Sequence, residues 1–359
     1  MRLTALTWSL LGAATVAALP AARAGEEPAA AFAAFCAKRA GEVKIMTVPG
    51  RDGWLFLRGE LRHLSVGPFW GEAAAQSSQA AREDCKDPLP AVVDFKEQLE
   101  KLGIELVLVI VPPKATVYPD MLGADVKVEA GQVPPRLDGQ LQAFAAALKE
   151  KGVKTVDLWP ELAAGRSAPD APMYCRTDTH WSGAACARAA KLVAAELAGR
   201  DWLKDRKTEK FETEEREVPV RGDLVEALPE KERPGPEKLK LRFVGRRAAA
   251  GGVLQPVLPD RASPVLLLAD SHGLVFHIGE DLFAKGAGLA DQLAFELGFP
   301  VEVMATRGSA STKVRVDLYQ RGKADDKWLA GKKAVVWCFT ARELTESLDG
   351  WRKVPVVKK

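Results

Sequence analysis

Residues Leu266-Leu-Leu-Ala-Asp-Ser-His-Gly273 join an apolar run to a serine and a glycine. The apolar run is typical of a strand buried on both faces, and Gly273 indicates a sharp turn after it. In α/β proteins, active sites lie outside the carboxyl ends of such strands. A serine at such a turn has an exposed hydroxyl beside its own backbone N–H, which makes Ser271 a candidate nucleophile. The alternative is an Asp-Ser turn that only caps the next segment.

The alternation of strands and helices continues on both sides of this stretch. Strands are predicted over residues 104–111, 153–158, 239–244, 264–269, 301–305 and 334–339. Helices are predicted over residues 92–102, 137–151, 182–197, 289–297 and 325–330. Apolar strands separated by amphipathic helices indicate a mostly parallel sheet covered on both faces. We therefore expect a single α/β domain.

A second informative segment is Arg176-Thr-Asp-Thr-His-Trp-Ser-Gly-Ala184, in a chain with only 4 histidines. Asp178 is close enough to His180 to accept a hydrogen bond from one ring nitrogen, which leaves the other nitrogen free as a base. Together with Ser271, these residues predict a Ser-His-Asp triad. In one alternative, Asp178 only stiffens a turn. In another, the pair binds a metal, but no third ligand at a supporting spacing is evident, so we expect no metal.

The other histidines are weaker candidates. His272 adjoins Ser271 but would point elsewhere from an extended or turn backbone, so we expect it to be a poor base. His63 and His277 have no distinctive sequence context. We therefore assign the predicted base to His180.

Three further residues follow predicted strand ends and are candidates for oxyanion or substrate binding. The Ser271 N–H is the first candidate oxyanion donor, and Arg307, in the turn after strand 301–305, is the second. Lys114 and Tyr118 follow strand 104–111 and could line a sugar groove. The alternatives are a surface arginine for Arg307 and structural roles at a proline-rich turn for Lys114 and Tyr118.

The first residues are typical of a secretory signal. Met1-Arg2 precedes an apolar stretch over residues 3–19, and Ala22-Arg23-Ala24 fits a small-x-small cleavage pattern. We expect cleavage after Ala24 and a periplasmic protein, with an uncleaved N-terminal membrane anchor as the alternative. Removing the two arginines of this segment from a formal net charge of +3 leaves +1. This near-neutral balance gives no indication of nucleic-acid binding, which needs a clustered basic surface.

The remaining boundaries follow from composition. After a signal peptide over residues 1–24, we expect an N-terminal arm over 25–49, a main domain over 50–345 and a tail over 346–359. Residues 204–240 are rich in charge and proline, which predicts an exposed insertion or irregular loop.

The chain has 5 cysteines, and an exported protein can form disulfides. We expect Cys175 to pair with Cys186 across the Asp-His segment, and Cys36 to pair with Cys85, although spacing alone does not determine connectivity. Cys338 lies in the apolar run 334–339 and is expected to be a buried free thiol. No cysteine or histidine cluster has the spacing of a structural zinc site.

Five segments, in this order, resemble the AlgX/AlgJ group of alginate O-acetyltransferase-like proteins, which have an SGNH-hydrolase-like fold. They are Gly50-Arg-Asp-Gly-Trp-Leu-Phe56, Val111-Pro-Pro-Lys-Ala-Thr-Val-Tyr-Pro119, Asp178-Thr-His-Trp181, Ala269-Asp-Ser271, and Val336-Trp337 with Arg342. Gly222-Asp-Leu224 also fits the pattern. The resemblance spans about residues 50–345 and implies a three-layer α/β/α domain. It makes Ser271 the nucleophile, His180 the general base and Asp178 its orienting partner.

The sequence departs from this group at three positions near the predicted site. Ala269 replaces a glycine, His272 replaces the usual phenylalanine, and Cys338 stands where an acidic residue often follows Trp337. Ala269 could crowd the oxyanion site and His272 could alter acceptor contacts. Neither change removes a member of the predicted triad.

The resemblance implies an exported O-acetyltransferase of exopolysaccharide biosynthesis that works through an acetyl-serine intermediate. It implies an acetyl supply from a membrane-bound O-acyltransferase, a polysaccharide acceptor and no cofactor. It does not imply that the polysaccharide is alginate. One alternative is a carbohydrate acetylesterase with the same triad. Another is a catalytically silent scaffold or glycan-binding subunit that retains the fold.

Overall fold

The computed structural model describes residues 26–126, 128–129, 131–248 and 251–358. The predicted signal peptide and its cleavage site lie outside these residues. Five parallel strands form the central sheet in the order β4-β3-β10-β8-β9. Their bounds are β3 Glu105–Val111, β4 Lys154–Val156, β8 Val265–Ala269, β9 Glu302–Ala305 and β10 Ala334–Thr340. The predicted parallel α/β sheet is confirmed.

The three inner strands are buried on both faces because their apolar residues alternate between two cores. In β3, Val107 and Val109 pack into one core, whereas Leu106 and Leu108 pack into the other. Successive side chains of a strand point to opposite faces, so one continuous apolar run serves both cores. The sheet is therefore the middle of three layers.

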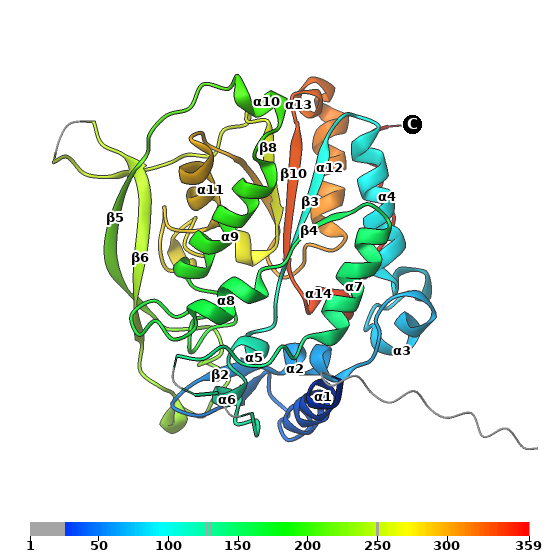
Figure 1. The fold of residues 1–359 in the computed structure, drawn as a ribbon, viewed down its shortest axis with the longest axis vertical. Coiled ribbons are helices and arrows are strands. Elements are labelled where there is room, and N and C mark those ends of the chain that lie inside the picture. Colours follow the sequence, from blue (N-terminus) through cyan, green and yellow to red (C-terminus); the bar gives the residue numbers. More distant parts are fainter. Residues whose placement is uncertain (1–25, 127, 130, 249–250, 359) are drawn as a thin grey trace, which may run out of the picture.

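Helices cover both faces of the sheet (Figure 1). The helices that pack into the first core include α8 Trp159–Gly165, α9 Gly183–Leu197 and α11 Leu289–Leu297. Those that pack into the second core are α4 Pro88–Glu100, α7 Gly139–Glu150, α12 Lys313–Ala324 and α13 Asp326–Ala330. The expected three-layer α/β/α arrangement is confirmed.

Several helix boundaries follow from local chemistry. Ser182 caps α9 through its hydroxyl, which accepts from the N–H groups of Ala184 and Ala185, as the sequence predicts. Asp87 caps α4 in the same way, and a proline in the first turn lets this helix start earlier than the predicted residue 92. The helix α12 was not predicted from the sequence. Its twelve residues include four arginines or lysines, and only one narrow face of the helix is buried, so its apolar pattern is weak.

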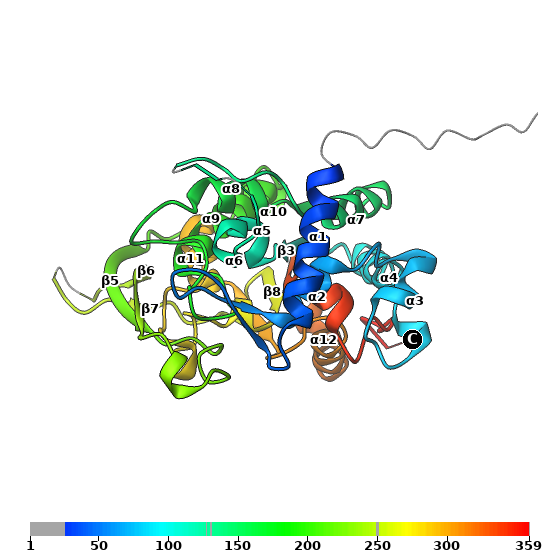
Figure 2. The same ribbon diagram turned by 90° about the horizontal axis from the view of Figure 1, so that it is seen from below.

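The carboxyl ends of the strands meet a group of short elements and the N-terminal helix. Figure 2 looks onto this end of the molecule, where α1, α2, α5 and α6 lie. The bounds here are α1 Glu26–Gly41, β1 Thr47–Pro49, β2 Leu55–Leu57, α2 Arg58–Ser65, α5 Lys114–Val117 and α6 Pro119–Leu122. Strands β1 and β2 form an antiparallel pair. Residues 25–49, expected to be an arm, therefore include a helix that packs on α2 and buries Phe32 and Cys36 in the first core.

The remaining short helices are α3 Ala74–Ser77, α10 Asp201–Lys204 and α14 Glu343–Glu346. Short 3₁₀ turns span Gly71–Ala73, Glu83–Cys85, Glu230–Glu232, Ser271–Gly273 and Glu280–Leu282. None of the helices in the described ranges is long and apolar enough to cross a membrane.

Residues 204–240 were predicted to be an exposed insertion or irregular loop, and the structure shows a mostly exposed segment that contains one strand and the start of a second. Strand β5 Glu212–Val220 pairs antiparallel with β6 Glu237–Arg246, and β7 Gln255–Pro256 extends the pair to a second, three-stranded sheet. Opposite charges face each other across the hairpin, as in the ion pair of Lys240 with Glu215 at 2.6 Å. Alternate residues of β6, including Leu239 and Leu241, join the first core. The charge that predicted a loop is the solvent-facing half of an amphipathic hairpin.

Candidate active site

Ser271 directly follows β8 and begins the 3₁₀ turn Ser271–Gly273. Asp270 ties this turn in place, because its Oδ1 accepts from His272 N at 2.7 Å and its Oδ2 accepts from Thr340 N at 2.9 Å. A Cβ on Gly273 would lie 2.4 Å from Ala269 Cβ, so the turn requires glycine. Ala269 packs into the first core rather than into the site. The serine thus sits at the carboxyl end of a central strand, as predicted.

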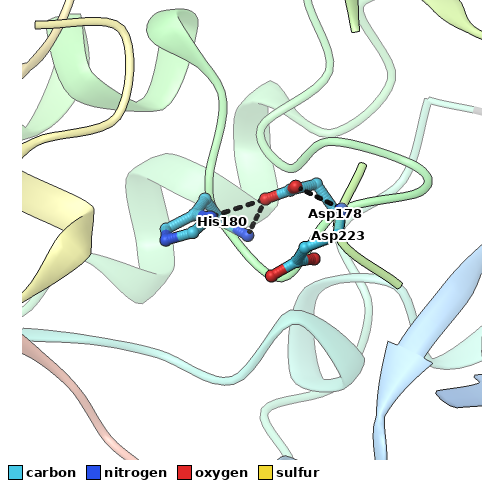
Figure 3. Close-up of side chains that lie close together, drawn as sticks. All are labelled: Asp178, His180 and Asp223. Atoms are coloured by element: carbon cyan, nitrogen blue, oxygen red, sulfur yellow. Dashed lines mark hydrogen bonds and ion pairs between the residues drawn. The ribbon is translucent and has the colours of Figure 1, made fainter. Parts of the chain in front are cut away.

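The structure brings Ser271, His180 and Asp178 together. His180 Nε2 lies 2.8 Å from Ser271 Oγ, and His180 Nδ1 lies 2.6 Å from Asp178 Oδ1. Asp178 Oδ1 also accepts from the backbone N–H of His180 at 2.9 Å. Figure 3 shows the imidazole beside the Asp178 carboxylate. In such a pair, Nδ1 carries the proton and donates it in a hydrogen bond to the carboxylate, so the unprotonated Nε2 faces the serine.

The aromatic residue that follows His180 fixes this segment to the serine turn. Trp181 Nε1 donates to the carbonyl of His272 at 3.0 Å, and the Trp181 side chain is fully buried. Cys175 N donates to the carbonyl of His180 at 3.2 Å. The position of the imidazole relative to Ser271 is therefore held by contacts between two segments that are 91 residues apart.

A second carboxylate, which the sequence analysis did not assign, completes the surroundings of Asp178. Asp178 Oδ2 accepts from Asp223 N at 2.8 Å. The Asp223 carboxylate accepts from Thr179 N at 2.8 Å and from Thr179 Oγ1 at 2.7 Å. The two segments are in direct contact, since a Cβ on Gly222 would lie 2.1 Å from the carbonyl oxygen of Thr177. The only sequence signal for this contact was Gly222-Asp-Leu224, which fits the resemblance noted above.

Lys114 has a different place from the one expected. It does not line a groove, because it is 1% exposed and lies beneath the catalytic segment. Its Nζ donates to the backbone carbonyls of Leu55, Arg176 and Asp178 at 2.6, 3.0 and 3.1 Å. Burial lowers the pKa of Lys114, and the nearby Glu237 carboxylate is the largest opposing influence. A buried ammonium needs all three acceptors, so the strand end, with its two prolines, places Lys114 as a structural cation.

Tyr118 and Arg307 do not contact the triad through any hydrogen bond among the described residues. Tyr118 is 3% exposed and its hydroxyl bonds to the carbonyl of Arg166 and the N–H of Met173, although its ring lines a cavity beside the site. The Arg307 guanidinium forms an exposed pair with Asp281, with N–O distances of 2.6 and 2.8 Å. The Arg307 prediction is therefore not supported by geometry.

Electrostatics favour the charged form of the His-Asp pair. Burial opposes ionisation of Asp178, but the hydrogen bond and charge of His180 outweigh it and the pKa of Asp178 falls to about 2. Burial also opposes protonation of His180, but the Asp178 hydrogen bond and charge raise the pKa of His180 above its ordinary 6.5. The site thereby stabilises imidazolium beside carboxylate, which is the state reached once a serine proton has moved to His180.

Asp178, His180 and Asp223 also have ligand atoms within 4.8 Å of one another, a grouping that could hold a cation. Their donor atoms are already engaged. Both Asp178 oxygens accept N–H groups, both Asp223 oxygens accept from Thr179, and His180 Nδ1 faces Asp178. A metal would have to displace these hydrogen bonds, so the chemistry of the cluster fits a triad better than a metal site.

The two expected disulfides are wrong. All five cysteines, which lie within the described residues, are free and buried. Cys36 packs in the first core from α1, whereas Cys85 lies against Gly350 and Trp351 near the end of the chain. Cys175 Sγ instead approaches the carbonyl oxygen of Trp181 at 3.5 Å. The expectation that Cys338 is a buried free thiol is confirmed.

Two further residues stand close to the triad. The rings of His272 and His180 lie 4.8 Å apart between centroids, and burial lowers the pKa of His272 to about 4, which keeps it neutral. His272 therefore packs against the ring of His180, the predicted base. Arg342 follows β10, is half-buried, and donates to Thr340 Oγ1 at 3.2 Å. It forms no ion pair among the described residues, and the sequence analysis gave it no role.

The fold and the site together define a class of protein, namely a three-layer α/β/α domain with a serine at the end of a central strand and a His-Asp pair facing it. The family described as "SGNH hydrolase-like domain, acetyltransferase AlgX" matches residues 47–341. The chain belongs to this family, and the resemblance inferred from the motifs is confirmed.

Relatives carry related names. A probable alginate O-acetylase AlgJ of Pseudomonas syringae pv. tomato is 30% identical over 261 residues, which are 71% of this chain and 58% of the relative. A probable alginate O-acetylase AlgJ of Pseudomonas aeruginosa is 29% identical over 212 residues, 57% of this chain and 48% of the relative. The chain thus spans about half the length of these curated relatives.

Solved structures agree with the fold. The O-acetyltransferase domain of Pseudomonas putida AlgJ has a TM-score of 0.60 and 25% identity, covering 84% of this chain and 92% of that domain. AlgX of Pseudomonas aeruginosa has a TM-score of 0.56 and 16% identity, covering 87% of this chain and 66% of that one. The second likeness concerns the fold alone.

Proposed function

We propose that this protein is an exported polysaccharide O-acetyltransferase that uses Ser271, His180 and Asp178. The observation that carries the proposal is the position of one imidazole, with Nε2 at 2.8 Å from Ser271 Oγ and Nδ1 at 2.6 Å from Asp178. Membership of the acetyltransferase AlgX family supports acetyl as the transferred group. The names of the AlgJ relatives support a polysaccharide as the acceptor.

In the first half-reaction, His180 Nε2 takes the proton of Ser271 while Oγ attacks the carbonyl carbon of the acetyl donor. The tetrahedral intermediate collapses, the bond to the donor oxygen breaks, and the imidazolium returns its proton to that oxygen. In the second half-reaction, His180 deprotonates a sugar hydroxyl, which attacks the acetyl-serine. The proton then returns to Ser271, and the acetylated sugar leaves. Asp178 stays ionised and holds the imidazolium throughout.

The negative charge on the carbonyl oxygen is stabilised by donors at the end of the sheet. The first residue of a helical turn has no acceptor within that turn for its N–H, and the Ser271 N–H meets no acceptor among the described residues. We assign it as an oxyanion donor. The charge of Arg342 reaches both histidines of the site, and it adds a positive potential where the negative charge develops.

The proposal also includes the source of the acetyl group and the location of the protein. An acetyl-serine mechanism needs no nucleotide cofactor in the same compartment as the acceptor, so an acetyl group delivered by a membrane-bound O-acyltransferase is sufficient. The signal-like residues at the start of the sequence support export to the periplasm.

The test compares wild-type protein with Ser271→Ala, supplied with an acetyl ester donor and with candidate glycans. Acetylated glycan, detected by mass spectrometry, is expected only with the wild type. Ser263→Ala is a matched control, because Ser263 lies before the opposite end of the same strand β8. Acetate release without glycan labelling would identify an acetylesterase instead. Equal results for wild type and Ser271→Ala would overturn catalysis and favour a silent glycan-binding subunit.

A further inference from the structure

A cavity of about 710 Å³ lies beside the catalytic segment but contains no member of the triad in its lining. Four stretches of the chain that are far apart in sequence form its walls. They contribute Trp54, Tyr118, Arg166, Arg176 and Glu237, among others. We call this cavity the Trp54 pocket. Its size is that of a small-molecule site, and its lining combines aromatic faces with a few charged groups.

The aromatic wall is ordered by its neighbours. The rings of Trp54 and Tyr118 lie 4.2 Å apart between centroids and are tilted by 31°. The Tyr118 hydroxyl is held by Met173 N at 2.9 Å, so the ring that supports Trp54 has a fixed orientation. Lys114 Nζ lies 5.3 Å from the centre of the Trp54 ring. Trp54 itself is only half-buried, which leaves part of an anchored indole free to contact the apolar C–H face of a sugar ring.

Most charged groups of the pocket have partners, although the exposed Glu129 carboxylate forms no ion pair among the described residues. Arg166 pairs with Asp120. The Glu237 carboxylate accepts from Arg176 N at 3.0 Å and from Thr177 N at 3.1 Å. The Arg176 guanidinium, in contrast, has no carboxylate partner among the described residues, and its Nε is buried without an acceptor. Arg176 lines the pocket, and its planar guanidinium favours a ligand that offers acceptor oxygens.

We infer that the Trp54 pocket binds a sugar residue of the acceptor polysaccharide, at a distance along the glycan from the residue that is acetylated. The sugar ring packs on Trp54, and a carboxylate or hydroxyl oxygen of the sugar accepts from Arg176. This inference rests on the proposed function. Arg176 is two residues before Asp178, and two residues of extended chain span at most roughly 7 Å. The pocket and the proposed triad thus adjoin the same short segment of chain, and an oligosaccharide lying along this segment would contact both.

Binding remote from the reacting hydroxyl has a kinetic consequence. Interactions with parts of a substrate that do not react can position its reactive group, so longer acceptors become better substrates. Acetylation should therefore increase with acceptor length until the glycan reaches the Trp54 pocket. A small acetyl ester donor does not need the pocket at all.

The test measures glycan binding by calorimetry with Ser271→Ala protein, so that no turnover occurs. The probes are an oligomannuronate, which carries carboxylates, and a cello-oligosaccharide of equal length, which does not. Arg176→Gln and Trp54→Ala, each added to Ser271→Ala, are expected to weaken binding about tenfold, since each removes one principal contact. Arg188→Gln, a surface arginine paired with Glu161 in a different groove, is the matched control and should bind as the parent protein does.

The two probes distinguish whether the sugar oxygen that accepts from Arg176 belongs to a carboxylate or to a hydroxyl. Weaker binding of the oligomannuronate alone assigns a carboxylate to Arg176, whereas equal weakening of both probes assigns a hydroxyl. Failure of Ser271→Ala protein to bind either probe overturns the inference, as does unchanged binding in the pocket variants. Thermal unfolding checks that each variant is folded. If Trp54→Ala does not fold, Arg176→Gln still tests the pocket.

The glycan-binding measurement can succeed or fail independently of acetyl transfer. If wild type acetylates no glycan but Ser271→Ala protein binds the probes through Trp54 and Arg176, the pocket stands and the proposed transferase function fails. If wild type acetylates glycans and the pocket variants have an unchanged KM for long acceptors, the function stands and the pocket inference fails. A KM raised about tenfold for long acceptors supports both.

Discussion

The backbone N–H of Asp223 donates to Asp178 Oδ2 at 2.8 Å, while the Asp223 side chain accepts from both the N–H and the hydroxyl of Thr179. The segment that begins with Gly222 is thus docked onto the predicted catalytic loop from both sides. The orientation of Asp178 depends on this contact as much as on its own hydrogen bond to His180. Four predictions follow from the surroundings of this pair.

Activity should depend on the protonation of His180. The base must be neutral to accept the serine proton, and the Asp178 carboxylate raises the pKa of His180 above 6.5 against the opposing effect of burial. The rate should therefore rise with pH through a value above 6.5 and fall as pH drops below it. The measurement is kcat/KM for a small acetyl ester across pH. An acid limb centred well below 6.5 would contradict this assignment.

Asp223→Asn separates charge from position. The negative charge of Asp223 is one of the influences that raise the pKa of His180, after the Asp178 hydrogen bond and charge. Asparagine retains a side-chain acceptor for Thr179 but not the charge, and the backbone N–H to Asp178 is unchanged. The acid limb of the pH profile should move to lower pH, with a loss in kcat of about tenfold or less. A loss of activity without any movement of the limb would mean that Asp223 acts only by position.

His272 should make the folded protein sensitive to mild acid. Burial lowers the pKa of His272 to about 4 from its ordinary 6.5. The neutral ring contributes stability that is fully present above 6.5 and is lost as pH falls toward 4, a loss of the order of 3 kcal/mol. His272→Phe should flatten this part of the curve of unfolding free energy against pH. His63, whose pKa burial lowers to about 3, contributes to the slope that remains.

Lys114→Met should impair both folding and catalysis. It leaves the carbonyls of Leu55, Arg176 and Asp178 without their buried donor, which should cost roughly 3 kcal/mol of stability. Because the carbonyl of Asp178 loses its anchor, kcat of the folded protein should fall about tenfold.

The matched control for this change is Lys332→Met. Lys332 Nζ is also buried, donates to the backbone carbonyls of Arg261 and Ser263, both at 2.7 Å, and pairs with Glu302 at 2.6 Å, at the opposite ends of the strands. This variant should be destabilised to a similar extent while the folded enzyme keeps its kcat. Unfolding by denaturant and turnover of an acetyl ester measure the two effects. Equal loss of kcat in both variants would show that Lys114 has no special effect on the site.

Short sequence patterns were sufficient to predict much of the fold and the central residues of the candidate site. The apolar runs of β3, β8 and β10 predicted buried parallel strands, because short, continuous apolar runs bounded by turn signals are typical of strands buried on both faces. The Asp-x-His spacing predicted a paired imidazole, because the carboxylate lies only two positions before the ring it contacts. Ser271 could be proposed because a serine after such a strand lies at the edge of the sheet where active sites occur.

Other predictions failed where one segment meets another that is distant in sequence. Lys114 and Arg307 both follow strands, yet one is buried under three backbone carbonyls and the other pairs with Asp281 at the surface. The charged stretch 204–240 looked like a loop because the strand β6, which provides its cross-strand partners and its apolar face, lies mostly beyond it. The expected disulfides failed because spacing along the chain does not measure the separation of cysteines in space.

The sequence by itself therefore determined the parallel α/β class and predicted which serine, histidine and aspartate would form the proposed triad, since these depend on hydrophobic periodicity and on neighbours two residues apart. Only the tertiary structure decided which groups orient that carboxylate, which cation is buried beneath it and which arginine beside it lacks a partner. Those properties are set by Asp223, Lys114 and Arg176, through contacts across 45 residues or more in the first two cases. Whether a charge is satisfied depends on atoms that fold against it, and residue order does not specify that.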